Sequence, residues 1–339
     1  MRTILAVTGT LVNAVATGLL VFLVALTPAH AALTHSHLAV KAISKAYGFV
    51  LGQHYSLARI ESTYPEAAMQ VELARLTFNS AFPGVEKKLE AELIAALTEP
   101  KFKELRSEMI NKIRPLLVKQ AITPQLAQQF LDQVKARAKG DEMEPDVLRY
   151  LLAVLYAANP VAEFGDGFRQ RFRTDGTGKS QGVRLILQLP RSWLAKDGER
   201  PHIVQKWISQ GGDGDSMILL LMFDAEGSNP TQQEITQFVQ SGEVRAILPE
   251  LGRMRDAGTF ALEKRTGFWV DMSLNMERVG VRMYARGSMH QLFINGKWMQ
   301  LQCMSYAKET EPNKADAAAR LNKPICHQAL NSLVLEQAS

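Results

Sequence analysis

Apolar side chains recur with a helical period through the first half of the chain. In the segment VEKKLEAELIAAL, Val85, Leu89, Leu93 and Leu97 are four residues apart, which places them on one face of a helix. The next segment, FKELRSEMINKIRPLLV, repeats this pattern and contains Pro115, a residue that kinks or ends a helix. The pattern therefore predicts two consecutive amphipathic helices.

Two further helices have recognisable boundaries in the sequence. Thr123 can cap a helix that has Pro124 at its first position, and Gly140 suits the end of that helix. Pro145 then opens a strongly apolar helix that ends before Pro160. The order of these signals predicts short connections between packed helices.

Together these segments predict an all-helical domain over residues 32–160. Within it, residues 47–84 have a less regular pattern and include several Gly and Pro residues. Residues 161–181 are rich in Gly, Asp and Thr and mark the change from a helical to an alternating period. We interpret residues 161–181 as a linker and the entry to a sheet.

The second half of the chain, residues 182–339, alternates with the period of a β-strand. Residues 182–223 hold three predicted strands, of which the first ends at Pro190. Residues 217–223 are continuously apolar, as expected for a strand at the centre of a sheet with both faces covered. We expect an open loop over residues 191–201, between the first strand and the second.

The remaining elements extend and cover this sheet. Thr231 and Glu234 form a capping box at the start of a helix, and Asn295-Gly296 is a tight hairpin signal between two long strands. An amphipathic helix closes the chain. The predicted fold class is α+β: an all-helical domain followed by an antiparallel sheet sandwiched by helices.

The first 31 residues read as a signal peptide for export. One early cation, Arg2, precedes a long apolar run that Pro28 breaks before the triplet AHA. Small residues at both ends of that triplet suit signal peptidase, so we expect cleavage after Ala31. An uncleaved membrane anchor is the alternative, because residues 4–26 are long enough to cross a bilayer. Either reading places the bulk of the chain outside the cytoplasm, and cleavage makes the protein periplasmic or secreted.

The charge pattern argues against a nucleic-acid partner. The formal net charge is only +5, and Lys and Arg are interleaved with Asp and Glu along the chain. The segment DGTGKS fails as a phosphate loop, because Arg173 stands where that motif needs Gly and a strand follows where a helix is required. The sequence offers no metal-ligand cluster, so we expect no cofactor and no metal.

The chain contains two cysteines, Cys303 and Cys326, both in the part destined for export. In an oxidising compartment an even number of cysteines is typical of a disulfide. The alternative is two buried free thiols, since Cys also packs as a small apolar side chain. Both readings stay open at this point, because pairing depends on a Cα separation that the sequence does not contain.

Four strand segments carry a resemblance to a known family. LQLPRSW, IVQKWIS, MILLLMF and LFINGKWMQLQC follow one another, with a helical insertion after the third and a closing helix after the last. In this order they resemble the PsbP-like fold, named for an extrinsic subunit of photosystem II. GERPHIVQKW and KWMQLQCM also look like segments of uncharacterised exported bacterial proteins with a helical N-terminal part. The resemblance implies a binding or assembly module and supplies no catalytic residues.

These observations favour an exported, non-enzymatic binding or assembly protein of the cell envelope. The partner is an unknown protein or small molecule, and a membrane only if the N-terminal segment is uncleaved. An exported hydrolase with its site in the loop at residues 191–202 is the alternative, although no nucleophile or metalloprotease motif supports it. Within that loop, the candidate ligand-binding residues are Trp193, Arg200 and His202.

Overall fold

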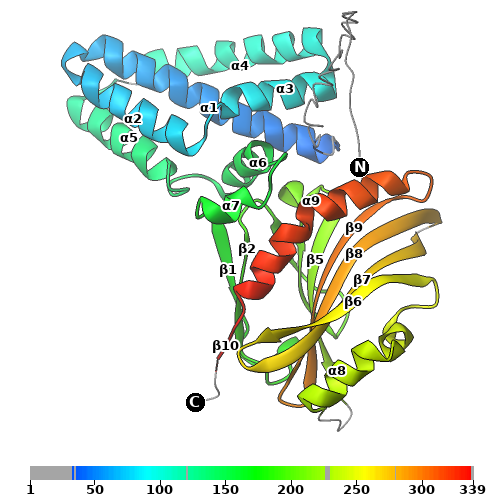
Figure 1. Ribbon diagram of the computed structural model, residues 1–339. Helices are drawn as coiled ribbons and strands as arrows, with labels where there is room; N and C mark the ends of the chain where they lie inside the picture. The colour runs from blue at the N-terminus through cyan, green and yellow to red at the C-terminus, as the bar shows by residue number, and fades with distance from the viewer. Residues whose placement is uncertain (1–32, 34–35, 120, 226–229, 279, 337–339) are drawn as a thin grey trace, which may run out of the picture.

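The computed structural model describes residues 33, 36–119, 121–225, 230–278 and 280–336. Helices fill the first part of this range and antiparallel strands the second, so the predicted α+β fold class is confirmed (Figure 1). The expected signal segment lies outside the described residues. No helix within the described residues is both long and apolar enough to cross a membrane.

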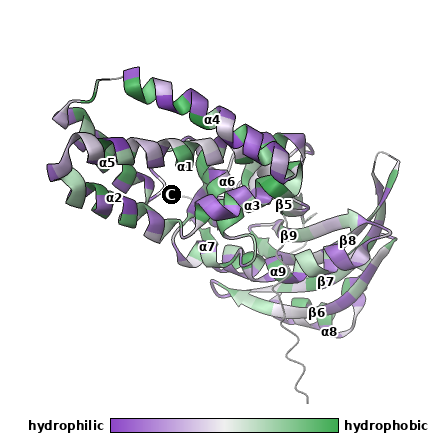
Figure 2. Cartoon of the chain, turned by 90° about the horizontal axis from the view of Figure 1, so that it is seen from above, coloured by the Kyte–Doolittle hydropathy of each residue, from purple (hydrophilic) through white to green (hydrophobic). Residues whose placement is uncertain are grey.

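The helical half is organised around its first and longest helix. In chain order it contains α1 (His37–Thr63), the 3-10 turn η1 (Pro65–Ala67), α2 (Ala68–Ala81), α3 (Val85–Leu97), α4 (Glu99–Lys119), α5 (Pro124–Arg137), α6 (Pro145–Leu155) and α7 (Ala162–Gly165). α1 packs against α3 and α6, and α6 is buried along most of its length. Surface helix α4 alternates hydrophilic and hydrophobic colours along its length in Figure 2, and within it only Phe102 is buried.

Residues 47–84, the less regular segment of the sequence, are α-helical except at residues 64–67 and 82–84. α1 and α2 run through almost all of this segment, separated only by η1. Apolar side chains of the segment pack inward, as Tyr47 and Phe78 show by being buried. The hydroxyl of Tyr47 also donates a hydrogen bond of 2.8 Å to Glu90, which fixes α1 against α3. Tertiary packing therefore overrides the weak helix propensity of Gly48 and Gly52 inside α1, whereas Pro65 and Pro83 lie between α-helices.

The second half contains all ten strands of the described residues. In chain order it contains β1 (Arg169–Arg173), η2 (Gly178–Ser180), β2 (Leu185–Pro190), β3 (Leu194–Asp197), β4 (Ile203–Ile208), η3 (Gln210–Gly212), β5 (Ser216–Asp224), α8 (Gln232–Gln240), η4 (Glu243–Ile247), β6 (Gly252–Leu262), β7 (Arg265–Arg278), β8 (Val281–Ile294), β9 (Lys297–Lys308), α9 (Pro312–Asn331) and β10 (Val334–Leu335). The capping box of α8 and the hairpin turn before β9 form as predicted, with positive φ at both Asn295 and Gly296.

The strands form two sheets, which corrects the expectation of one sheet. A seven-stranded sheet has the order β3-β4-β5-β9-β8-β7-β6, and a three-stranded sheet has the order β1-β2-β10. β2 therefore belongs to the small sheet, because β1 and β10 occupy its two edges. β5 is an interior strand between β4 and β9, but β9 holds the middle position that was expected for β5.

The two faces of the seven-stranded sheet carry different helices (Figure 1). We call the face against α9 the inner face; there Ile218, Leu292 and Leu301 pack with Ile325 and Leu330. We call the opposite face the outer face. There Phe268, Val270 and Met272 form a separate cluster with Ile235 of α8 and Val244 of η4. The sheet is thus sandwiched by helices, as predicted.

A disulfide joins α9 to the inner face. Cys303 of β9 and Cys326 of α9 are bonded, with their Cα atoms 6.2 Å apart. This decides between the two readings of the cysteine pair in favour of the disulfide. In the chain-entropy description, closing a loop of this length stabilises the folded state by about 3 kcal/mol.

Candidate functional site

The three candidate residues of the predicted loop lie at two ends of a hairpin. The prediction of an open loop over residues 191–201 is wrong, because residues 194–197 form β3. This strand pairs with β4, with Leu194 opposite Ile208 and Asp197 opposite Gln205. Trp193 precedes this hairpin and is buried in the inner-face core, only 3% exposed. Arg200 and His202 flank its far end. Arg200 is exposed, whereas the ring of His202 stacks on Phe223 at a centroid distance of 5.1 Å.

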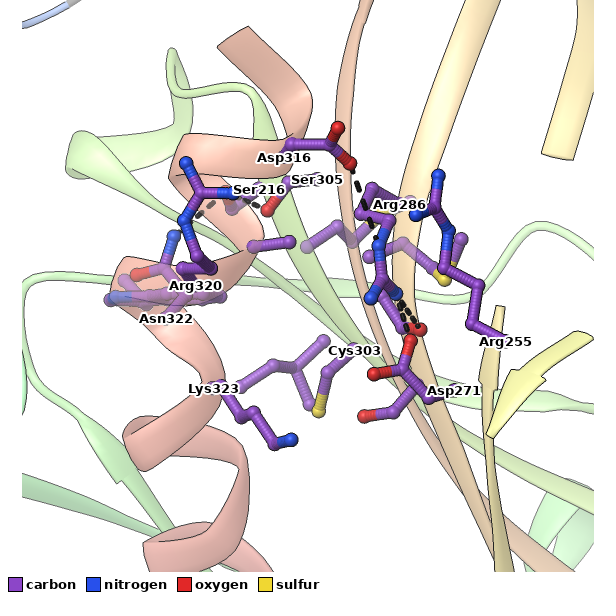
Figure 3. A pocket seen from close by; sticks show the side chains of 17 residues that line it. Ser216, Arg255, Asp271, Arg286, Cys303, Ser305, Asp316, Arg320, Asn322 and Lys323 are labelled. Carbon is purple, nitrogen blue, oxygen red and sulfur yellow. Dashed lines mark hydrogen bonds and ion pairs between the residues drawn. The ribbon is translucent and has the colours of Figure 1, made fainter. Parts of the chain in front are cut away.

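The structure contains two cavities of interest in this half of the chain. The first, which we call the charged cleft, lies between α9 and the inner face and has a volume of about 200 Å³ (Figure 3). Trp193, Cys303 and a group of charged side chains line it. That charged group comprises Arg255, Asp271, Arg286, Asp316, Arg320 and Lys323.

Arg286 of β8 is the central charge of the cleft. It forms an ion pair with Asp271 of β7, and its Nε lies 3.5 Å from Asp316 of α9. Burial opposes the charge of this guanidinium, but the two carboxylates outweigh burial and raise the pKa of Arg286. Asp271 and Asp316 therefore both pair with a guanidinium that stays charged.

Neutral polar groups complete the charged cleft. The hydroxyls of Ser216 and Ser305 lie 2.7 Å apart, and the Asn322 amide donates to Ser216 over 2.9 Å. Gly287 lets β8 and β9 approach closely beside them, because a Cβ there would lie 1.9 Å from the carbonyl oxygen of Cys303. The close approach of backbones explains why Gly occupies this position.

The second cavity, which we call the aromatic pocket, lies between α8 and the outer face. Its volume is about 720 Å³. Its apolar lining consists of Phe223, Pro230, Ile235, Phe238, Ile247, Phe268 and Trp298, and its polar lining of Glu234, Gln237, Glu243, Gln291 and Gln300. Phe268 makes edge-to-face contacts with both Phe238 and Trp298, and the ring centroids lie 5.8 Å apart in each pair.

Local sequence explains how the aromatic pocket forms. The capping box of Thr231 and Glu234 starts α8, so that Ile235 and Phe238 project onto the sheet from one face of that helix. On the sheet side, Phe268 and Trp298 point to the outer face because of strand alternation, as does Gln300. The side-chain amide of Gln291 donates a hydrogen bond of 2.7 Å to Oε1 of Gln300, so the pair keeps further N–H donors and the Oε1 acceptor of Gln291 for a ligand.

The three candidate residues of the sequence analysis do not form one site. Trp193 lines the charged cleft, and His202 contacts Phe223, which lines the aromatic pocket. Arg200 lines neither cavity. Sequence reasoning missed Arg286 and Lys323, because nothing in a local window indicates that β8 and α9 face each other.

The described residues contain no group of three or more His, Cys, Asp or Glu side chains that could hold a metal ion. Several acids of the described residues form ion pairs or cap helices instead. Glu234, for example, accepts hydrogen bonds from both the backbone and the hydroxyl of Thr231.

No protein-family model matches the chain, and no curated protein matches it. Similar solved structures include the cyanobacterial PsbP protein (CyanoP) of Synechocystis sp. PCC 6803, with 11% identity, 50% of this chain and 92% of that chain covered, and a TM-score of 0.30. LpqN of Mycobacterium tuberculosis, a protein involved in cell envelope biogenesis, is 14% identical, with 53% of this chain and 98% of that chain covered and a TM-score of 0.30. The Ran-binding protein Mog1p of Saccharomyces cerevisiae is 5% identical, with 49% of this chain and 95% of that chain covered and a TM-score of 0.33.

A PsbP protein is thus among the similar structures, as the strand order led us to expect. The likeness covers about half of this chain. The resemblance to exported bacterial proteins with a helical N-terminal part stays a prediction.

Proposed function

We propose that this protein is an exported envelope protein that binds a small, uncharged, apolar molecule in the aromatic pocket. The observation that carries the proposal is the lining of the pocket: seven apolar residues and five polar ones, two of which form an amide pair, border a volume of about 720 Å³. Small-molecule sites commonly have volumes of about 300 to 1,000 Å³ and combine an apolar lining with few polar groups. The pocket matches both properties.

The charges that line the pocket disfavour an anionic ligand. Glu234 and Glu243 are the ionisable residues that line it. Hydrogen bonds from the backbone and side chain of Thr231 lower the pKa of Glu234, so this carboxyl stays ionised. An anionic ligand would therefore meet like charge, whereas the amides of Gln291 and Gln300 can hydrogen-bond a neutral polar group.

A matched pair of fluorescent probes tests the ligand class. N-phenyl-1-naphthylamine and 1-anilinonaphthalene-8-sulfonate share one ring system and differ by a sulfonate. We expect the uncharged probe to bind with a fluorescence increase and at least several-fold more tightly than the sulfonate. Titration of both probes into the mature protein measures the two affinities.

Two aspartate variants locate the bound probe. Ile247 lines the pocket and is 38% exposed, so Ile247→Asp places a charge at the pocket with little effect on folding and should weaken binding of the uncharged probe at least tenfold. Leu126 on α5 has a similar exposure, 45%, and Leu126→Asp should leave binding unchanged. Tighter binding of the sulfonate, or equal affinities in the two variants, would contradict the proposal.

Export is supported by the N-terminal sequence and by the disulfide. Disulfides persist in oxidising compartments and are rare in the cytosol. We expect the intact mass of protein isolated from cells to correspond to a chain that begins at Ala32 and lacks the two thiol hydrogens of Cys303 and Cys326. A mass that includes residues 1–31 would support the membrane-tethered alternative instead, and free thiols would argue against an oxidising location.

A further inference from the structure

Cations outnumber acids in the charged cleft. Arg255, Arg286, Arg320 and Lys323 line it together with only two carboxylates, Asp271 and Asp316. Figure 3 shows that Arg320 and Lys323 project from α9, whereas Arg255 and Arg286 project from strands on the opposite side. The cleft therefore brings together positive charges that are far apart in the sequence.

The two carboxylates of the cleft neutralise only one of these cations. Asp271 and Asp316 both pair with Arg286. Arg255 donates a hydrogen bond of 3.0 Å to the hydroxyl of Tyr284, which is a neutral group. A β-bulge between Met254 and Asp256 places Arg255 at this position. The charge of Arg255 thus remains available to a ligand.

Arg320 and Lys323 are the two cations on the α9 side. Neither side chain forms a hydrogen bond or an ion pair with any residue that the structure describes. They lie three residues apart on α9, so they share one face of that helix. Burial and, after it, the positive charge of Lys323 lower the pKa of His327.

We propose that the charged cleft binds an oxyanion, a phosphate or carboxylate group, between Arg320 and Lys323 on one side and Arg255 on the other. Arg and Lys side chains are the usual partners of such groups in proteins. A volume of about 200 Å³ admits a phosphate-sized group and excludes a large ligand. The hydroxyls of Ser216 and Ser305 provide neutral hydrogen-bonding groups nearby. This site is separate from the aromatic pocket and does not depend on the function proposed for it.

The disulfide holds the two sides of this site together. Arg320 and Lys323 lie on α9, as does Cys326, whereas Cys303 lies on β9 and itself lines the cleft. The covalent link therefore sets the distance between the helix and the strands that contribute the cations. We expect the site to weaken when the link is removed, even where the protein stays folded.

Calorimetric titration of the mature protein with inorganic phosphate at low ionic strength tests the site. We expect one phosphate to bind per chain, with an affinity that falls as salt is added. The double variant Arg320→Gln/Lys323→Gln should bind at least tenfold more weakly, because it removes two of the three charged partners of the anion. Lys314→Gln is the matched control: Lys314 also lies on α9 but pairs with Glu311 and does not line the cleft.

A second arm distinguishes a free anion from a lipid headgroup. Flotation with phosphatidylglycerol vesicles, compared with phosphatidylcholine vesicles, reports binding to a membrane-bound phosphate. Vesicle binding that depends on Arg320 and Lys323 would assign the site to a headgroup, whereas binding of inorganic phosphate alone would assign it to a soluble anion. Absence of both, or equal phosphate affinity in the double variant and the native protein, overturns the proposal.

The variant Cys303→Ser/Cys326→Ser completes the test. Its circular dichroism spectrum shows whether the fold is kept, and its phosphate affinity shows whether the disulfide holds the site. Weaker binding by a folded variant is the expected result. An unchanged phosphate affinity would show that the disulfide does not hold the site together.

Discussion

At the scale of single residues, Glu163 is a carboxyl buried in the connection between the two halves. It lies in α7, is only 1% exposed, and accepts hydrogen bonds from the backbone (2.7 Å) and the hydroxyl (2.6 Å) of Ser192. Burial raises the pKa of Glu163 from its ordinary value of 4.5 to about 7, although the bonds from Ser192 act in the opposite direction. Between pH 4.5 and about 7, the carboxyl of Glu163 is therefore protonated in the folded protein and ionised in the unfolded chain.

This pKa predicts how stability depends on pH. Because the folded state binds more protons between pH 4.5 and about 7, the contribution of Glu163 to stability is complete below that window and is lost as pH rises through it. We expect the free energy of unfolding to fall by about 2 to 3 kcal/mol more in the native protein than in Glu163→Gln between pH 5 and pH 8. Urea unfolding of both proteins at the two pH values measures this difference.

Two comparisons isolate the effect of Glu163. Burial lowers the pKa of His290 to about 4, so this residue destabilises the folded state as pH falls. His290 is present in both proteins, so its effect cancels in the difference between their free energies of unfolding. Glu250→Gln, at an exposed carboxyl, controls for the loss of one negative charge. Identical pH slopes in the native protein and in Glu163→Gln would show that the carboxyl is ionised throughout.

At the scale of elements, the sequence predicts best what a few neighbouring residues decide. Thr231 with Glu234 fixes the start of α8, and Asn295-Gly296 fixes the β8–β9 turn, because each signal acts through hydrogen bonds and φ angles within one turn. β3 was missed because three of its four residues are exposed, so the strand has no apolar alternation. Its existence depends on pairing with β4.

Long-range pairing explains the other errors. β2 was assigned to the large sheet because its alternating pattern is that of any strand with a buried face. Its actual partners are β1 and β10, and β10 comes from the end of the chain, where Val334 pairs with Ile186. The charged cleft has the same origin, since Arg286 and Lys323 meet only when α9 packs on β8. A pattern read along one segment contains no information about which segment lies opposite.

At the scale of the whole molecule, the two halves meet where α6 contacts η3. The carboxylate of Asp213 accepts hydrogen bonds from the hydroxyl of Tyr150 (2.5 Å) and from that of Ser36 (3.1 Å). Burial and the bond to Asp213 raise the pKa of Tyr150, so its hydroxyl keeps its proton at neutral pH. Gly211 lies against the ring of Tyr150 with a φ of 72°. Both its left-handed backbone and the close ring require Gly there.

A pair of Gly→Ala substitutions tests how this contact couples the halves. In Gly211→Ala the new Cβ would lie 2.6 Å from Cζ of Tyr150, so the ring of Tyr150 or the backbone of η3 must shift at the contact between the halves. Gly84→Ala, inside the helical half, imposes a similar strain at a φ of 64° but meets nothing within 4 Å. The left-handed backbone alone costs about 1 to 2 kcal/mol in both variants. We expect Gly211→Ala to lose more stability and, in addition, to uncouple the two halves.

Two spectroscopic signals follow the halves separately, because all four tryptophans, at positions 193, 207, 269 and 298, lie in the sheet half. Tryptophan fluorescence therefore reports unfolding of the sheet half, and far-ultraviolet circular dichroism is dominated by the helices. We expect the two urea transitions to coincide in the native protein and in Gly84→Ala, since a cooperative unit unfolds at one midpoint by every probe. In Gly211→Ala the midpoints should differ. Coincident midpoints in Gly211→Ala would mean that the coupling depends on other contacts between the halves, such as the hydrogen bond from Arg191 to the carbonyl of Gly140.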